Sequence, residues 1–175
     1  MAEVHIIGQL IGAQGFPNLN LFCKWEIKCG GGWKVVSGLQ EGQTQVDHPS
    51  FEEFAYWCHP IDIHFATKGI QGWPKVHLEV YQEDSYNRSE LVGYGCCHIP
   101  SSAGTHQVTC ATWRPLGSTR DRLRQYFVGG GPQLTNPDLV SSTRDRFRLT
   151  TETMGTVHLE LTVILRNFTQ HGIES

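Results

Sequence analysis

The segment from residue 157 to residue 166 alternates between apolar and polar side chains. The apolar set is Val157, Leu159, Leu161, Val163 and Leu165. Because successive side chains of a β-strand point to opposite faces of its sheet, this period of two places one face on a core and the other in solvent. The segment is therefore predicted to be a half-buried strand.

The same alternation recurs along most of the chain. It is clear around Val76, Leu78 and Val80 and again around Ile61 and Ile63. Further segments of this kind lie near residues 3–11, 21–28, 33–37, 43–47, 91–99 and 105–110. Glycines, prolines and asparagines separate them, as expected for turns. The spacing predicts an all-β fold, an antiparallel β-sandwich of about eight strands.

One stretch breaks this pattern late in the chain. Ser118 lies three residues before Asp121, close to the arrangement of a helix capping box. Apolar residues follow at helical spacing, namely Leu123, Tyr126 and Phe127. We expect one short helix over residues 119–127, inserted late in the sandwich.

The length and charge of the chain restrict its class. A chain of 175 residues fits one domain, and folding at this size buries roughly 70% of the chain's surface. The net charge of −3 favours neither nucleic acid nor anionic membranes in general. The N-terminus has neither the basic start nor the apolar core of a secretory signal, and no apolar run is long enough to span a membrane. We therefore expect a cytoplasmic protein that binds no nucleic acid.

Six cysteines and nine histidines form no recognisable metal motif. The nearest approach is Cys58 and His59 together with His64, but a proline and a strand pattern separate its members. We expect the cysteines to act as small buried hydrophobes, and we expect no metal and no cofactor. His77 and His158 fall, like His64, on predicted solvent faces.

No catalytic motif is present. The sequence contains neither Gly-x-Ser-x-Gly nor His-Glu-x-x-His. Since catalytic groups can meet in space from distant positions, this absence alone is weak evidence. Nothing in the sequence argues for an enzyme.

Residues 80–95, VYQEDSYNRSELVGYG, resemble the third loop of C2 domains, a known calcium-binding loop. The spacing of that loop aligns Gln82, Asp84 and Glu90 with three acidic ligand positions. Gln82 stands where the family has Asp, and Glu90 replaces the final Asp. The earlier ligand loop of C2 domains corresponds to residues 15–22, which hold no aspartate. Because calcium affinity depends on the number of charged ligands, we expect this degenerate site to bind no calcium.

Longer stretches are similar to the B9 domain family, a divergent C2-type group found at the base of cilia. They are HPIDIHFATKGIQGWPKVHLEVY, GYGCCHIPSSAGTH, TWRPLGS, FVGGGPQL and GTVHLEL, in this order. The resemblance covers residues 2–168 as a single domain and leaves residues 169–175 as a C-terminal tail. It implies a C2-like sandwich with no catalytic residues.

The resemblance also implies a function and partners. It points to a calcium-independent, non-catalytic scaffold subunit of the tectonic-like Meckel-syndrome complex. This complex lies at the basal body and transition zone of the cilium, where it supports ciliogenesis and a membrane diffusion barrier. The implied partners are B9 domain-containing protein 1 and the Meckel-syndrome protein with a B9 domain. The alternatives are a calcium- or lipid-regulated domain that binds anionic membranes peripherally, and a β-sandwich enzyme or carbohydrate-binding domain.

A basic heptapeptide occurs twice. Residues 118–124, STRDRLR, recur as STRDRFR at residues 142–148, and together they hold six of the 14 lysines and arginines. The arginines are Arg120, Arg122, Arg124, Arg144, Arg146 and Arg148. Guanidinium groups suit carboxylates and phosphates, so these arginines are candidates for binding a partner or a lipid. The alternative is a solvated face on which each aspartate neutralises part of the charge.

A scaffold subunit is expected to expose apolar side chains to its partners. Phe22, Tyr81 and Ile164 fall opposite the inferred core positions of their strands. We predict that all three point outward.

Overall fold

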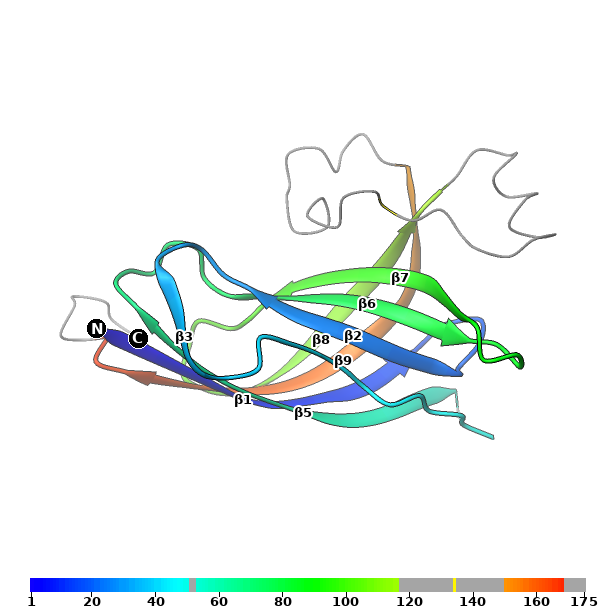
Figure 1. The fold of residues 1–175 in the computed structure, drawn as a ribbon, viewed down its shortest axis with the longest axis horizontal. Helices are drawn as coiled ribbons and strands as arrows, with labels where there is room; N and C mark the ends of the chain where they lie inside the picture. Colours follow the sequence, from blue (N-terminus) through cyan, green and yellow to red (C-terminus); the bar gives the residue numbers. More distant parts are fainter. Residues whose placement is uncertain (51–52, 117–133, 135–149, 169–175) are drawn as a thin grey trace.

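The computed structural model describes residues 1–50, 53–116, 134 and 150–168, and these residues form nine β-strands (Figure 1). The strands are β1 (Ala2–Gln14), β2 (Leu21–Lys28), β3 (Trp33–Gly38), β4 (Glu41–Gln43), β5 (Phe54–Thr67), β6 (Lys75–Glu83), β7 (Ser89–His98), β8 (Gly104–Pro115) and β9 (Thr151–Arg166). The predicted all-β antiparallel fold is confirmed, with nine strands instead of about eight. The helix expected over residues 119–127 lies outside the described residues.

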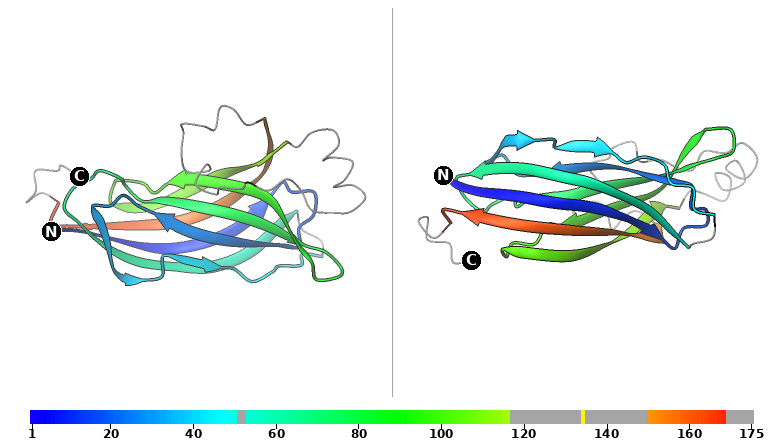
Figure 2. Two further views of the ribbon diagram at one scale, coloured as in Figure 1. Left: turned by 45° about the horizontal axis from the view of Figure 1, so that its top comes forward. Right: turned by 90° about the horizontal axis from the view of Figure 1, so that it is seen from below.

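The nine strands form one sheet in the order β3-β5-β1-β9-β8-β7-β6-β2-β4. The sheet curls into two layers, and β5, β1 and β9 lie side by side in the layer that faces the viewer in the right-hand view of Figure 2. The two layers are connected where β7 pairs with β8, through Tyr94 with Trp113 and Gly95 with Thr112. The layers are thus joined by a very short ladder on one side.

The predicted inward positions do form the core between the layers. The four residues Val157, Leu159, Leu161 and Val163 are almost completely buried, as are Val76, Leu78 and Val80 on the opposite layer. β9 runs antiparallel to β1 along nearly its whole length, so its apolar face continues that of β1. This confirms the interpretation of the alternation as one face on a core.

Tryptophan indoles brace this core by donating to backbone carbonyl groups. Trp57 Nε1 on β5 donates to the carbonyl oxygen of Leu21 on β2 at 3.0 Å, which links the two layers. Trp33 Nε1 donates to the Gln71 carbonyl oxygen at 2.9 Å. Buried indoles need such acceptors, and the backbone supplies them here.

Two residues expected on solvent faces are buried. His77 is 3% exposed, because its strand β6 lies between β2 and β7 and its cross-strand neighbours flank it on both sides. Phe22 is 5% exposed and stacks on Tyr81, with ring centroids 5.1 Å apart. Ile164 is 48% exposed, as predicted. The prediction was wrong for His77 and Phe22.

The cysteines do not all behave as small buried hydrophobes. Cys23 and Cys110 are buried, whereas Cys58 is exposed at a left-handed position of β5 with a φ of 46°. All six described cysteines are free thiols. None of the described residues belongs to a helix that is long and apolar enough to cross a membrane.

Candidate functional site

The loop that resembles a calcium site is the hairpin between β6 and β7. Glu83 pairs with Ser89 at the end of the ladder. The tip is closed by two backbone hydrogen bonds, from the Asp84 amide to the Arg88 carbonyl oxygen and from the Asn87 amide to the Asp84 carbonyl oxygen, both at 3.0 Å. Asn87 takes a left-handed conformation with a φ of 58°, which asparagine tolerates better than most residues. The tip is therefore a tight turn with a defined shape.

Within this turn the Asp84 carboxylate is fully engaged by its own loop. Its Oδ1 accepts from the backbone amides of Tyr86 at 2.8 Å and Arg88 at 2.9 Å. Its Oδ2 accepts from Arg88 Nε and Nη2, each at 2.7 Å. The Arg88 amide, together with its guanidinium and the Tyr86 amide, holds the pKa of Asp84 below its usual value. The Arg88 guanidinium group thus forms an ion pair with the carboxylate that a calcium ion would need as a ligand.

The other two predicted ligand positions lie within strands. Gln82 and Glu90 are cross-strand partners within the ladder, whereas Asp84 lies beyond the ends of both strands. Within the described residues, no group of three or more His, Cys, Asp or Glu side chains could hold a metal ion. In the structure the Asp84 carboxylate shapes the turn between β6 and β7.

The loop between β1 and β2, which corresponds to the earlier ligand loop of C2 domains, contributes little charge to the candidate site. Its Asn20 carbonyl oxygen accepts from the Glu83 amide at 2.8 Å, which ties the two loops together. A hollow of about 590 Å³ beside this loop is lined by both polar and apolar residues, with Glu53 as its one acidic residue. A single carboxylate is far from the six to eight oxygen ligands that calcium takes.

Sequence reasoning missed Arg88, the residue that closes the loop. The signal was available, because Asp84 and Arg88 are four residues apart and of opposite charge. The six arginines of the repeated heptapeptides lie outside the described residues. They are Arg120, Arg122, Arg124, Arg144, Arg146 and Arg148.

The described residues form one curled antiparallel sheet of nine strands, an all-β domain. A family model described as "B9-C2: Ciliary basal body-associated, B9 protein" matches residues 4–164. The chain therefore belongs to the B9 domain family, as its sequence motifs predicted.

Relatives with known names support the same assignment. B9 domain-containing protein 2 of Danio rerio is 61% identical over 175 residues, which cover 100% of both chains. B9 domain-containing protein 1 of Mus musculus is 31% identical over 97% of this chain and 85% of its own length. Among solved structures, the C2A domain of plant extended synaptotagmin 1 aligns with a TM-score of 0.45, 13% identity and 93% coverage of each chain.

Proposed function

We propose that this protein is a non-catalytic scaffold subunit of the tectonic-like Meckel-syndrome complex in the transition zone of the cilium. The carrying observation is its 61% identity, over the whole of both chains, to B9 domain-containing protein 2. The description of the family as ciliary basal body-associated supports the location. In this role the protein contributes to ciliogenesis and to a diffusion barrier between ciliary and plasma membranes.

The proposed partners are B9 domain-containing protein 1 and the Meckel-syndrome protein that carries a B9 domain. The similarity of this chain to B9 domain-containing protein 1 supports a shared domain type, which suits assembly of related subunits. We propose residues 2–168 as the assembling domain and residues 169–175 as a tail.

The proposed scaffold works without calcium. The Asp84 carboxylate is already neutralised by Arg88, and Glu90 lies with Gln82 in the ladder. A calcium ion would have to displace a bidentate guanidinium group and would then find few other carboxylates. The loop keeps one shape at any calcium concentration.

Calcium is expected to leave the melting temperature unchanged. A ligand at 100 times its Kd stabilises a protein by about 2.7 kcal/mol, so even moderate affinity would be visible in a thermal melt. The measurement is a series of melts without calcium and with calcium from low-micromolar concentrations up to 1 mM, with magnesium as the control. A clear rise at low-micromolar calcium would favour the alternative of a calcium-regulated membrane-binding domain.

Assembly with B9 domain-containing protein 1 is expected on co-expression, with a higher soluble yield than the chain reaches alone. The arginine repeats are proposed to contribute to this contact. Replacing Arg144, Arg146 and Arg148 by Gln, and separately Arg120, Arg122 and Arg124, is expected to weaken capture of the partner. Exposed charges stabilise a fold by under about 1 kcal/mol each, so the melting temperature should hardly change.

Co-purification of the tagged protein and its variants from ciliated cells, at several salt concentrations, checks both statements. Capture by the unchanged protein should weaken as salt rises, because ions screen charged contacts. A wild-type chain that stays monomeric beside its partner on a sizing column would contradict the scaffold function. If the arginine variants fold and bind the partner normally at every salt concentration, the alternative holds and the repeats form a solvated face.

A further inference from the structure

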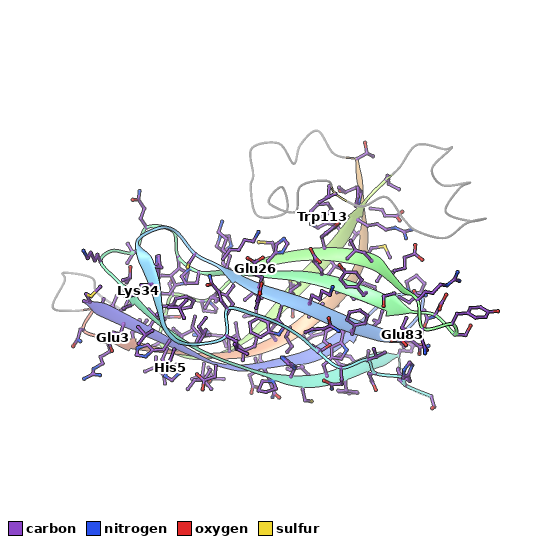
Figure 3. All side chains as sticks on the ribbon, viewed as in Figure 1. Glu3, His5, Glu26, Lys34, Glu83 and Trp113 are labelled. Carbon is purple, nitrogen blue, oxygen red and sulfur yellow. The ribbon has the colours of Figure 1, made fainter. Side chains whose placement is uncertain are left out.

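The strand β8 is paired along one side but only at its end along the other. It pairs with β9 from residue 104 to residue 115. Its ladder with β7 has two residue pairs, Gly95 with Thr112 and the neighbouring pair of Trp113, which is labelled in Figure 3. Within the described part of the chain, residues 104–109 therefore have a strand neighbour only on the β9 side. We call residues 104–109 the β8 edge.

The β8 edge is unpaired because the chain that leaves β7 turns toward the start of β6. The Ile99 amide donates to the Pro74 carbonyl oxygen at 3.3 Å, and Trp73 Nε1 donates to the Ile99 carbonyl oxygen at 2.8 Å. Contact with β7 ends at Cys110, whose Sγ would lie 2.9 Å from a Cβ atom at Gly95. In the right-hand view of Figure 2, β8 lies at the margin of the layer that also contains β9, β1 and β5.

The side chains of the β8 edge are held by its own layer. The Thr105 and Thr162 hydroxyl groups form a hydrogen bond at 2.8 Å, and Gln107 Nε2 donates to the Glu160 carboxylate. The His106 ring turns back and bonds a carbonyl oxygen of the preceding turn at 3.0 Å. Among the described residues, none of these contacts leads to a strand on the side away from β9. Every second residue of a strand edge directs its N–H and C=O groups away from the paired neighbour, so an added strand can bind here.

The β8 edge lacks the features that usually prevent pairing between chains. Natural edge strands commonly carry charged side chains, prolines or bulges. Residues 91–113 contain no Asp, Glu, Lys or Arg, and the one proline of β8 is at residue 115. The end strands β3 and β4 do carry charge, with Lys34 (labelled in Figure 3) and Glu41. The β8 edge is thus an uncharged and regular strand.

The sequence of the β8 edge also matches itself in reverse. Residues 105–109 read Thr-His-Gln-Val-Thr, with the three residues Thr105, Gln107 and Thr109 all exposed. When two such strands pair antiparallel about Gln107, Thr105 of each copy lies opposite Thr109 of the other. Threonine pairs directly opposite one another form favourable cross-strand contacts, and threonine and valine favour strands. A two-fold axis makes each of these contacts twice.

We propose that the β8 edge is a homodimer interface, at which two copies of this chain pair antiparallel about Gln107 and join their layers into one continuous sheet. A second copy is the occupant that the observations favour, because the edge is uncharged and its exposed residues are self-complementary. Backbone hydrogen bonds supply the affinity, and the row of threonines sets the register. The interface goes beyond the proposed scaffold function and does not depend on it. It would give an assembly two copies of this subunit.

The first test measures the mass of the full chain by sedimentation velocity over a series of concentrations. A dimer is expected to form as the concentration rises. Its Kd should hardly change with salt, because the β8 edge carries no charge that ions could screen. A chain that is monomeric at every concentration would overturn the proposal.

A pair of charge variants tests the location and the register. Thr105→Lys combined with Thr109→Lys is expected to raise the Kd of the dimer at least about tenfold, because like charges then lie directly opposite one another. Thr105→Glu with Thr109→Glu should do the same, and an equal mixture of the two variants should dimerise again. This rescue separates a lost contact from a lost fold. The matched control, Thr151→Lys with Thr153→Lys, changes exposed threonines of β9 and should leave the Kd unchanged.

A lysine variant that dimerises as the unchanged chain does, or a mixture that stays monomeric, would overturn the pairing about Gln107. Cross-linking with a short bis-maleimide checks the register independently. Thr105→Cys and Thr109→Cys are made separately in a chain in which the exposed Cys58 is replaced by Ser. The mixture should cross-link, whereas Thr105→Cys alone should not, because its two copies are offset by four residues, about 13 Å along the strands. Equal cross-linking of the two samples would also overturn the register.

These outcomes are separable from those for the scaffold function. The dimer measurement needs only this chain, whereas the scaffold test needs B9 domain-containing protein 1. A dimer without capture of that protein would leave the homodimer intact and count against the scaffold partner. A chain that is monomeric alone and loses capture of that protein in the lysine variant would assign the β8 edge to that protein and overturn the homodimer.

Discussion

Replacement of Trp57 by alanine is expected to lower the free energy of unfolding by about 3–5 kcal/mol, the range for large aromatic residues removed from a core. Trp57 lies on β5, is 3% exposed and contacts the opposite layer. Its Nε1 donates to the Leu21 carbonyl oxygen at 3.0 Å on β2. The change removes packing and a hydrogen bond between the two layers at once.

Trp57→Phe separates these two contributions. Phenylalanine keeps much of the apolar volume but removes the indole donor. The Leu21 carbonyl oxygen still accepts from the Asp47 amide at 3.1 Å, so the expected cost is that of one hydrogen bond, about 0.5–1.5 kcal/mol. In a chain of this size 1 kcal/mol corresponds to about 2–4 °C in melting temperature. Thermal and urea unfolding of both variants give the comparison. A phenylalanine variant as stable as the unchanged protein would contradict the bracing role of this indole, and an alanine variant as stable as the phenylalanine variant would contradict the packing contribution.

Gly8→Ala is expected to destabilise the protein by about 3 kcal/mol or more, at or above the upper end of the usual cost of overpacking. Gly8 lies in β1, with β5 on one side and β9 on the other. A Cβ atom there would lie 2.0 Å from the carbonyl oxygen of Glu160 and 2.9 Å from Cα of Leu161. These are backbone atoms of the neighbouring strand, so relief requires the ladder itself to move.

Gly31→Ala is the matched control for this prediction. A Cβ atom at Gly31 meets nothing within 4 Å, so the same chemical change should alter stability by less than about 0.5 kcal/mol. Urea unfolding and the yield of soluble protein are measured for both variants. If the two variants were equally stable, β1 and β9 could move apart without a cost in the free energy of unfolding. That result would contradict the expected clash at Gly8.

The closed hairpin between β6 and β7 connects the fold to the proposed function. In a calcium-dependent domain, loop shape and charge change when the ion binds. Here Arg88 supplies the positive charge from within the chain, so the turn has its shape from the moment of folding. A loop with a permanent shape suits a subunit that stays in an assembly. We therefore interpret Asp84 as a residue that fixes the shape of this loop.

Much of the fold follows from local pattern. The alternation from Val157 to Leu165 predicted the strand and its buried face, because the side-chain period of a strand is a property of its backbone alone. The motifs at residues 59–81 and 93–106 identified the B9 family in the same way, since they are contiguous in sequence. The interpretation of Gln82, Asp84 and Glu90 as a degenerate calcium loop also came from the spacing of residues along the chain, and it stays a prediction.

The tertiary structure decided which strands are neighbours and what covers their outer faces. Period two says which side of a strand meets the core, but it carries no information on the strands that flank it. This is why the burial of His77 and Phe22 was missed, since both are covered by residues on other strands. For the same reason the sequence does not show that β3 and β4, nearly adjacent along the chain, lie at opposite ends of the strand order.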